Sequence, residues 1–575
     1  MLLKFLRSLR GTDASRLIGR GLALRTQGDL PAAERLLREA TAAFPRDAVA
    51  AVNLALVLLE QHRAEAGAAE LQRALVLDPG NGAAHYNFAN LLRNSGQPAR
   101  ALDHFRQAAQ ARPAVPLARQ ELMFALLESC AWDEAEREAA LLRAHCAERA
   151  AGWMSAIAPL TATYLELDAA ACKAVAGWHA ARVACEFEPR RPAAAAGGGR
   201  LRIGYLSPDF REHPVGQLMA AALPLQDRDR FEIIAYSYGE DDAGAVRHRI
   251  AGAVDRFVDV AALSDAAVAA QMARDGVQVA VDLAGHTTGG RLGILARRPA
   301  PVQAHYLGYA ATTGAPYIDY FISDAVATPP GLADAFTEQL ACVPACFMAG
   351  GEAPAAVAAP PSRASQGLPA QAMVFSNFAN ASRISRAVFG LWMEILRAVP
   401  DSVLWLRQSQ PNVVECLREE AGRCGVDAAR LIFAGRVANR SEHMARLALA
   451  DLSLDTIGWH NGHSTTSELL WAGVPVLTAP GRTFASRVGA SLVSAAGLPE
   501  MIARDERDYV DIAVRLGRAR DACDHVRRRL VENKKAAPLF DRRGLVAGLE
   551  AVYLEMWGQV RAGGALRAID LRQNR

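Results

Sequence analysis

The most regular pattern along the chain is a series of short apolar runs separated by stretches with helical periodicity. Runs of this kind predict the strands of a parallel sheet. A first set lies in the middle of the chain: Leu201–Leu206, Phe231–Tyr236, Val277–Leu283, Val302–Tyr306 and Tyr320–Ile322. A second set follows a Gly- and Ala/Pro-rich stretch: Val374–Phe378, Val403–Leu406, Leu431–Phe433, Leu452–Leu454 and Val476–Leu477. We therefore expect two α/β lobes, with a ligand cleft at the C-terminal ends of the strands.

The front third of the chain carries an internal repeat with a period of 34 residues. Four sets of residues share this period: Pro45, Pro79 and Pro113; Ala40, Ala74 and Ala108; Ala33, Gly67 and Ala101; Gly28, His62 and Gly96. This is the tetratricopeptide spacing, with two antiparallel helices in each unit. A weaker unit continues through Leu126, Ala135 and Leu142. The pattern predicts an α-solenoid with a shared core and a concave groove.

Two asparagines occupy equivalent positions on the first helices of successive repeats, Asn53 and Asn87. The first helix of each unit lines the groove, so these amides could bind the backbone of an extended polypeptide. Glu121 stands at the next equivalent position and ends the series. The alternative is that asparagine at this repeat position has no ligand.

The two patterns divide the chain into five expected segments. We expect a repeat array over 15–147, linking helices and a breaker segment over 148–199, and a first α/β lobe over 200–350. An Ala/Pro-rich linker is expected over 351–370 and a second α/β lobe over 371–575. Within the linking segment, Pro159–Leu167 and Ala170–Cys185 have helical patterns, and Pro189–Gly199 breaks them.

Composition narrows the class of protein. The chain has 575 residues and a formal net charge of +3, which argues against a nucleic-acid-binding surface. No apolar run is long enough to span a membrane, and the first residues make a poor secretory signal. The nine cysteines show no CxxC spacing, so they indicate neither a zinc site nor a disulfide framework. We expect a cytoplasmic protein, and a homo-oligomer remains open.

The segment Leu452–Arg487 has the strongest local chemistry in the chain. A short apolar strand is followed by a glycine-containing turn and a hydroxyl-rich helix start at Ser464, Thr465 and Thr466. Helix N-termini carry unsatisfied N–H groups and a positive dipole end, which suit a diphosphate. Glu468, one turn into that helix, could accept hydrogen bonds from a ribose diol. The alternative is an ordinary strand-to-helix turn with capping hydroxyls.

Several motifs resemble one known family, the protein O-linked N-acetylglucosamine transferases and their SPINDLY-type relatives. The second lobe matches in Val374–Ile384, Ser402–Arg407 and Asp451–Arg487, and the first lobe in Leu201–Pro214 and Gly285–Arg291. Further matches are Arg298–Gln303 and Leu307–Tyr309. The resemblance implies a two-lobed glycosyltransferase of the GT-B type behind the repeats.

The resemblance also implies roles for individual residues. Asn380 and Arg383 match contacts to the donor diphosphate, and Arg440, His443 and Arg446 match contacts to the nucleotide, with His443 stacked on the base. His463, Ser464, Thr465 and Glu468 match phosphate and ribose contacts, and Thr466 belongs to the same helix start. Thr287 matches a sugar contact, and His213 matches a histidine at the acceptor side. The expected catalytic residues are His213 and Arg383.

This chain departs from the family at a few of these positions. The family has lysine where Arg383 and Arg440 stand, and an arginine still pairs with phosphate but is bulkier. The family reads Gly-Tyr-Pro-Gly-Thr where this chain has Gly308–Thr312, so Ala310 and Ala311 replace proline and glycine. That loop approaches the transferred sugar in the family, which leaves the identity of the sugar open.

The reaction implied is an inverting, metal-independent transfer of N-acetylglucosamine from UDP-N-acetylglucosamine to Ser or Thr of a polypeptide. The one acidic pair with the spacing of a metal clamp, Asp227 and Asp229, precedes a strand and is interpreted as a solvated turn. We therefore expect no metal, and protein cations to stabilise the leaving diphosphate. GDP-fucose or UDP-glucose as donor, and an inactive repeat scaffold that binds protein partners, remain the alternatives.

Overall fold

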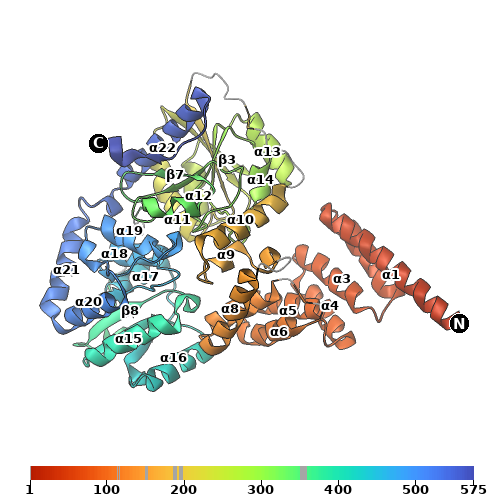
Figure 1. Cartoon of the computed structure of the whole chain (residues 1–575), viewed down its shortest axis with the longest axis horizontal. Helices are drawn as coiled ribbons and strands as arrows, with labels where there is room; N and C mark the ends of the chain where they lie inside the picture. The colour runs from red at the N-terminus through yellow and green to blue at the C-terminus, as the bar shows by residue number, and fades with distance from the viewer. Residues whose placement is uncertain are drawn as a thin grey trace. The chain divides into compact units, whose positions relative to one another are not determined.

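A computed structural model describes residues 2–112, 114–115, 117–148, 153–184, 191–192, 199–349 and 359–574 (Figure 1). The chain folds into two compact units, residues 1–148 and 149–575. Pro113, part of Pro189–Gly199 and the first half of the predicted linker lie outside the described residues.

The first unit consists of helices arranged as sequential antiparallel neighbours. They are α1 (Leu2–Thr26), α2 (Leu30–Ala43), α3 (Ala48–Glu60), α4 (Ala64–Leu77), α5 (Gly82–Asn94), α6 (Pro98–Gln110), α7 (Ala118–Glu128) and α8 (Trp132–Ala147). Ala40, Ala74 and Ala108 are all buried where paired helices cross. The predicted helical repeat is thereby confirmed.

The turn between the two helices of each repeat has the same backbone conformation every 34 residues. Gly28 and Gly96 have φ of 83° and 73°, and His62 at the equivalent place has φ of 61°. Cys130, one further period along, has φ of 52°. A positive φ favours glycine, so His62 and Cys130 hide the period from a search for glycine alone. Cys130 gives the weak fourth repeat its register.

The second unit begins with linking helices and the first α/β lobe. The linking helices α9 (Pro159–Ala162) and α10 (Ala169–Ala184) occur where predicted, although α9 ends earlier than expected. The first sheet is parallel throughout, in the order β13-β7-β6-β5-β4-β1-β2-β3. Its strands are β1 (Leu201–Ser207), β2 (Phe231–Ser237), β3 (Arg256–Asp259), β4 (Val279–Asp282), β5 (Val302–His305), β6 (Tyr320–Ser323), β7 (Gln339–Cys342) and β13 (Ile569–Asp570). Its helices are α11 (Pro214–Ala222), α12 (Ala245–Gly252), α13 (Asp265–Arg274) and α14 (Leu292–Ala296).

The second lobe contains a smaller parallel sheet in the order β10-β9-β8-β11-β12. Its strands are β8 (Met373–Asn377), β9 (Ser402–Arg407), β10 (Leu431–Ala434), β11 (Leu452–Leu454) and β12 (Val476–Leu477). Its helices are α15 (Arg386–Ala398), α16 (Pro411–Arg423), α17 (Arg440–Leu447), α18 (Ser464–Trp471), α19 (Val488–Ala495), α20 (Glu506–Arg518) and α21 (Arg520–Asn533). Both lobes are the parallel α/β structures that the apolar runs predict.

The end of the chain returns to the first lobe, which corrects one expectation. Residues 371–575 were expected to form the second lobe alone, but β13 pairs with β7 in parallel and so extends the first sheet. The preceding helix α22 (Arg542–Ala562) contacts α11 and β5, and Figure 1 shows it in dark blue among the green elements of the first lobe. Tyr553 of α22 and Tyr205 of β1 are both buried, with their hydroxyl oxygens 3.1 Å apart.

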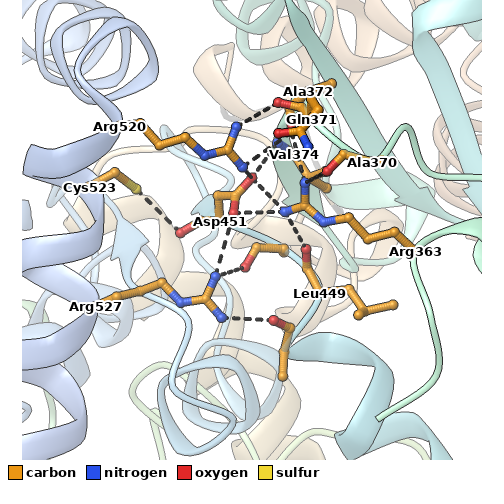
Figure 2. A network of polar contacts seen from close by, with 12 residues as sticks. Arg363, Ala370, Gln371, Ala372, Val374, Leu449, Asp451, Arg520, Cys523 and Arg527 are labelled. Atoms are coloured by element: carbon orange, nitrogen blue, oxygen red, sulfur yellow. Dashed lines mark hydrogen bonds and ion pairs between the residues drawn. The ribbon is translucent and has the colours of Figure 1, made fainter.

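A buried carboxylate fastens the segment before β8 to the second lobe. Figure 2 shows Asp451, just before β11, between three arginines. Arg363 donates to both carboxylate oxygens at 2.8 and 2.9 Å, Arg520 donates at 3.2 Å, and Arg527 lies 3.6 Å away. The Val374 N–H donates to the same carboxylate at 2.8 Å. Asp451 therefore joins three separate parts of the chain at the N-terminal end of β11.

No helix in the described part of the chain has the length and apolar character needed to cross a membrane.

Candidate functional site

The site is built on the loop that joins β11 to α18. Asp455, directly after β11, is buried, and its carboxylate accepts the Gly462 N–H at 2.7 Å and the Thr478 hydroxyl at 2.8 Å. The Asn461 side chain donates to the carbonyl of Thr456 at 3.0 Å and to the Thr478 hydroxyl at 3.1 Å. These bonds close the loop on itself and fix where α18 begins.

Helix α18 starts at Ser464, as predicted, with His463 as its cap residue. The His463 side chain does not accept from the helix N–H groups; its Nε2 lies 3.0 Å from the Ala485 carbonyl. Its ring stacks on His460 with centroids 4.5 Å apart. Ser464 and Thr465 are half-buried, whereas Thr466 is buried and packs under Gly462. Two of the three predicted hydroxyls are thus partly open to solvent.

Arg383 contacts this loop from the segment that follows β8. It lies in a short helical turn, Ala381–Arg383, capped by the Asn380 side chain, which accepts the Ser382 N–H. The Arg383 guanidinium donates to the Asn461 carbonyl at 3.2 Å. Burial and the charge of Arg383 lower the pKa of His463 to about 3, so that ring is neutral at physiological pH. The structure thus places Arg383 against the loop that ends at His463, and Asn380 caps the turn that carries Arg383.

Arg440 and Glu468 form an ion pair at the same helix start. The Arg440 Nη2 lies 3.2 Å from the Glu468 Oε1, and the His443 Nε2 lies 3.8 Å from the other carboxylate oxygen. Burial raises the pKa of Glu468, while Arg440 opposes that shift. The residue expected to hold a ribose thus already carries a cation beside it.

The remaining nucleotide candidates surround one aromatic side chain. His443 meets Phe378 edge to face at 5.8 Å, and the Arg446 guanidinium lies over the same ring at 5.4 Å. Burial and the neighbouring arginines lower the pKa of His443 to about 4, so its ring is neutral and can stack on a base. Arg446 is buried and donates to the Gly435 carbonyl and to Nδ1 of His443. It therefore supports the position of the His443 ring.

A cavity between the lobes opens beside these residues. It has a volume of about 210 Å³ and is lined from the first lobe by Glu212, Pro214, Gln217 and Arg249, and from the second by Arg440, Ser464, Ser467 and Glu468. His213 caps α11 at this edge: its Nδ1 accepts the Val215 N–H at 3.3 Å and lies 3.5 Å from Asp209. Burial lowers its pKa, and Asp209 opposes that shift.

A larger cavity of about 950 Å³ lies next to the loop that departs from the family. Ala310, Ala311 and Thr312 line it, together with Trp459, Phe484 and the linking segment around Glu166. Glu338 is buried under this loop, where it accepts the Thr312 hydroxyl at 2.6 Å and the Thr313 N–H at 2.7 Å. Thr287 lies in a different turn, where its hydroxyl donates to the Ala284 carbonyl at 2.8 Å.

In the first unit, Asn53 and Asn87 adopt the same geometry on α3 and α5. Each side-chain NH₂ donates to the carbonyl four residues earlier, Val49 and Ala83 respectively, at 2.8 Å. Both are half-buried. Glu121 on α7 is instead paired with Arg93 at 2.8 Å, so the series of equivalent amides has two members, as predicted.

Sequence reasoning missed the residues that support the site from behind. Asp455 and Asn461 stood inside the matched segment but were not singled out, although a buried-strand aspartate before a glycine turn is a recognisable signal. Phe378 and Glu338 gave no local signal, because their partners are distant in sequence.

Comparisons with known proteins identify the family of this chain. The family described as Glycosyl transferase family 41 matches over residues 181–356 and 348–549, and a tetratricopeptide repeat family matches over 70–103. A relative from Arabidopsis thaliana, named as a probable UDP-N-acetylglucosamine–peptide N-acetylglucosaminyltransferase SEC, is 36% identical over 62% of this chain and 37% of its own length. The Arabidopsis SPINDLY protein is 31% identical over 69% of this chain and 44% of its own length.

Among solved structures, a mutant O-GlcNAc transferase from Thermobaculum terrenum superposes with a TM-score of 0.70 at 30% identity. The match covers 96% of this chain and 99% of that one, which confirms the expected GT-B architecture behind a repeat array. The chain spans about two fifths of the length of the curated relatives it matches. Since the family match extends over both α/β lobes, the chain belongs to glycosyl transferase family 41.

Proposed function

We propose that this protein transfers N-acetylglucosamine from UDP-N-acetylglucosamine to the hydroxyl of Ser or Thr in a polypeptide. The observation that carries the proposal is the convergence of Arg383, His463 and the start of α18 on one loop at the C-terminal end of β11. Ligands bind parallel α/β lobes at this end of the strands. The names of the relatives, which specify UDP-N-acetylglucosamine and peptide, give the donor and the acceptor.

The reaction is a single displacement. The acceptor oxygen attacks the anomeric carbon, the bond from that carbon to the diphosphate oxygen breaks, and the configuration inverts. Negative charge grows on the departing diphosphate, where Arg383, Arg440 and the first N–H groups of α18 stabilise it. His443 stacks on the base, Arg446 supports it, and Glu468 accepts from the ribose. Asn380 and Thr287 complete the donor contacts.

The acceptor proton goes either to His213 or to an oxygen of the donor phosphate. The Val215 N–H points at Nδ1 of His213, which places the proton of the neutral ring on Nε2. In that form the ring donates a hydrogen bond to the acceptor side of the cleft. To accept the acceptor's proton at Nε2, the neutral ring must first carry its own proton on Nδ1, where the Asp209 carboxylate, 3.5 Å away, can accept it in place of the bond from Val215.

No metal enters this mechanism. The acidic pair Asp227 and Asp229 forms a turn before β2, in which the Asp229 N–H closes on the Asp227 carboxylate at 3.0 Å. This turn fits the interpretation of the pair as a capped turn before a strand, and unchanged activity in EDTA is the test of a metal-independent reaction. The positive groups of the site then carry the charge stabilisation that a metal supplies in other enzymes.

The test is to incubate the purified chain with tritium-labelled UDP-N-acetylglucosamine, UDP-glucose or GDP-fucose, each with and without casein as polypeptide acceptor. We expect hydrolysis and incorporation with the first donor, released by mild alkali as expected for a Ser/Thr linkage, and unchanged in EDTA. Transfer from GDP-fucose or UDP-glucose instead would reassign the donor. Binding of casein with no donor turnover at all would favour the inactive scaffold.

The tetratricopeptide repeats of the first unit support a polypeptide as the acceptor. Asn53 and Asn87 present two equivalent amides one repeat apart, and each amide keeps its side-chain oxygen as an acceptor for a backbone N–H. Repeat solenoids bind extended segments on such concave surfaces.

A further inference from the structure

Two buried aspartates flank the three-residue strand β11, and their environments differ. Asp451 at the N-terminal end is surrounded by the arginines of Figure 2. Asp455 at the C-terminal end is 3% exposed and accepts a backbone N–H and a hydroxyl. Since ligands bind at the C-terminal ends of parallel strands, Asp455 stands where a charge can act on a ligand site.

Asp455 and Arg383 bind the two ends of one peptide group, the one between Asn461 and Gly462. The N–H of Gly462 donates to the Asp455 carboxylate at 2.7 Å, and the carbonyl of the same peptide, that of Asn461, accepts from Arg383 at 3.2 Å. A carboxylate on the N–H end of a peptide strengthens the carbonyl at the other end as an acceptor. The guanidinium has five N–H groups in a fixed plane, so holding one of them sets the direction of the rest.

Two glycines lie directly against the Asp455 carboxylate. A Cβ on Gly462 would lie 2.8 Å from one of its oxygens, and a Cβ on Gly489 would lie 2.4 Å from the other. Both positions are glycine, which leaves the carboxylate room between the loop and α19. The Tyr509 hydroxyl donates to the Asp455 carbonyl at 2.9 Å and fixes the backbone as well.

From these contacts we propose that Asp455 is a positioning residue of the donor site, which orients Arg383 through the peptide between Asn461 and Gly462. The assignment rests on the proposed function, in which Arg383 faces the leaving diphosphate. Asp455 does not touch the substrate. It sets where the guanidinium points when the diphosphate departs.

The positioning role requires the charged form of Asp455, which predominates above its pKa. Burial raises its pKa to about 7, while the Gly462 N–H, the Thr478 hydroxyl and Arg383 hold it down. Two other titratable groups that face it are His460 and His463, and burial and Arg383 lower the pKa of both. Tyr509 is a further titratable group beside Asp455; burial, together with the Asp455 charge, raises the pKa of its hydroxyl. A negative charge kept in an apolar place costs stability, which is expected where function requires it.

The test is a double-mutant cycle on binding of UDP, measured by calorimetry, with Asp455→Asn and Arg383→Ala. Asp455→Asn should weaken binding by about tenfold, because Asn lacks the charge that holds the peptide. In the Arg383→Ala background the same change should have little further effect, because the cation that it orients is gone. If Asp455→Asn instead weakens UDP binding by the same factor with Arg383 present and with Arg383 replaced by alanine, its role is merely structural and the proposal is overturned.

Two further arms separate the possible failures. Asp451→Asn is the matched control: it removes a buried aspartate from the other end of the same strand and should leave UDP affinity unchanged. Wild-type protein that binds no UDP would refute the proposed function itself, whereas wild-type binding with no loss in Asp455→Asn would refute only the positioning role. Should Asp455→Asn fail to fold, Thr478→Val takes its place in the cycle. This variant removes the hydroxyl that donates to the other oxygen of the Asp455 carboxylate. The proposal then requires the same non-additivity between Thr478→Val and Arg383→Ala.

Discussion

The Nδ1 atom of His213 accepts the backbone N–H of Val215 at 3.3 Å, so this side chain caps α11, between two residues, Glu212 and Pro214, that line the cavity between the lobes. A substitution therefore removes a helix cap and a candidate catalytic group together. The two effects can be separated, because asparagine is among the best helix caps and cannot take part in proton transfer near neutral pH.

We predict that His213→Ala and His213→Asn both lower kcat, while donor affinity changes little, since all the proposed donor contacts except Thr287 lie on the second lobe. His213→Asn should keep the thermal stability of the wild type, and His213→Ala should lose about 1 kcal/mol through the missing cap. Turnover, calorimetric affinity and melting temperature measure the three effects. Wild-type turnover in His213→Asn would mean that the residue is only a cap, and a parallel fall in affinity would make it a donor contact.

Arg383→Ala should reduce turnover by a factor on the order of 10²–10³ while the protein stays folded, because it removes a preorganised cation that faces the leaving diphosphate. Arg383→Lys should retain much of the activity, since the family has lysine at this position. Arg386→Ala, an exposed arginine on the next helix, is the control and should be neutral. Full turnover by a folded Arg383→Ala protein would remove Arg383 from the mechanism.

The raised pKa of Asp455 leads to a prediction of how the free energy of unfolding depends on pH. Its pKa is raised to about 7 in the folded chain, against about 3.9 in an unfolded chain, so folding favours its protonated form. The corresponding stabilisation is present in acid and is lost as the pH rises from about 4 to about 7.

Relative to the wild type, the Asp455→Asn variant should therefore gain stability as the pH rises through this range, because it has no charge to bury. Denaturant melts of both proteins at pH 5 and pH 7.5 measure the change in their difference. A difference that is constant, or that moves in favour of the wild type at higher pH, would contradict a raised pKa for this carboxylate.

The parts of the fold that could be predicted from sequence are those in which one local pattern decides the structure. Strands β11 and β12 have the predicted bounds, because both are short runs of buried apolar residues between clear breaks. Strand β3 was missed because Arg256–Asp259 is half-exposed at a sheet edge and has a polar pattern. Strand β13 was missed because its pairing with β7 depends on a return across the whole second lobe.

The same division holds for the site. His463, Ser464 and Glu468 follow one another on a single helix start, so a motif could reveal them. Asp455 takes its role from Gly462 and from Thr478, which lies 23 residues away, and only the folded loop brings them together. The pairing of Arg440 with Glu468 likewise joins two helices and could not be predicted from either one alone.

The last prediction concerns the groove of the repeat array. If Asn53 and Asn87 hold an acceptor backbone, replacing both with alanine should slow modification of casein, each lost hydrogen bond being worth about 0.5–1.5 kcal/mol. Hydrolysis of the sugar nucleotide without acceptor should be unchanged, because neither residue belongs to the donor site.

Transfer to short peptides should also be unchanged if they reach only the cleft. Gln107→Ala is the control, since Gln107 is an exposed amide on the second helix of the same repeat as Asn87, outside the groove-lining series. Both asparagines bond to their own helix through the NH₂ group, so the loss of that bond alone would appear as lower stability with no change in rate. Equal rates on casein for the double variant and the wild type would therefore assign these amides to the packing of the repeats, and acceptor choice would have to be made by the catalytic lobes.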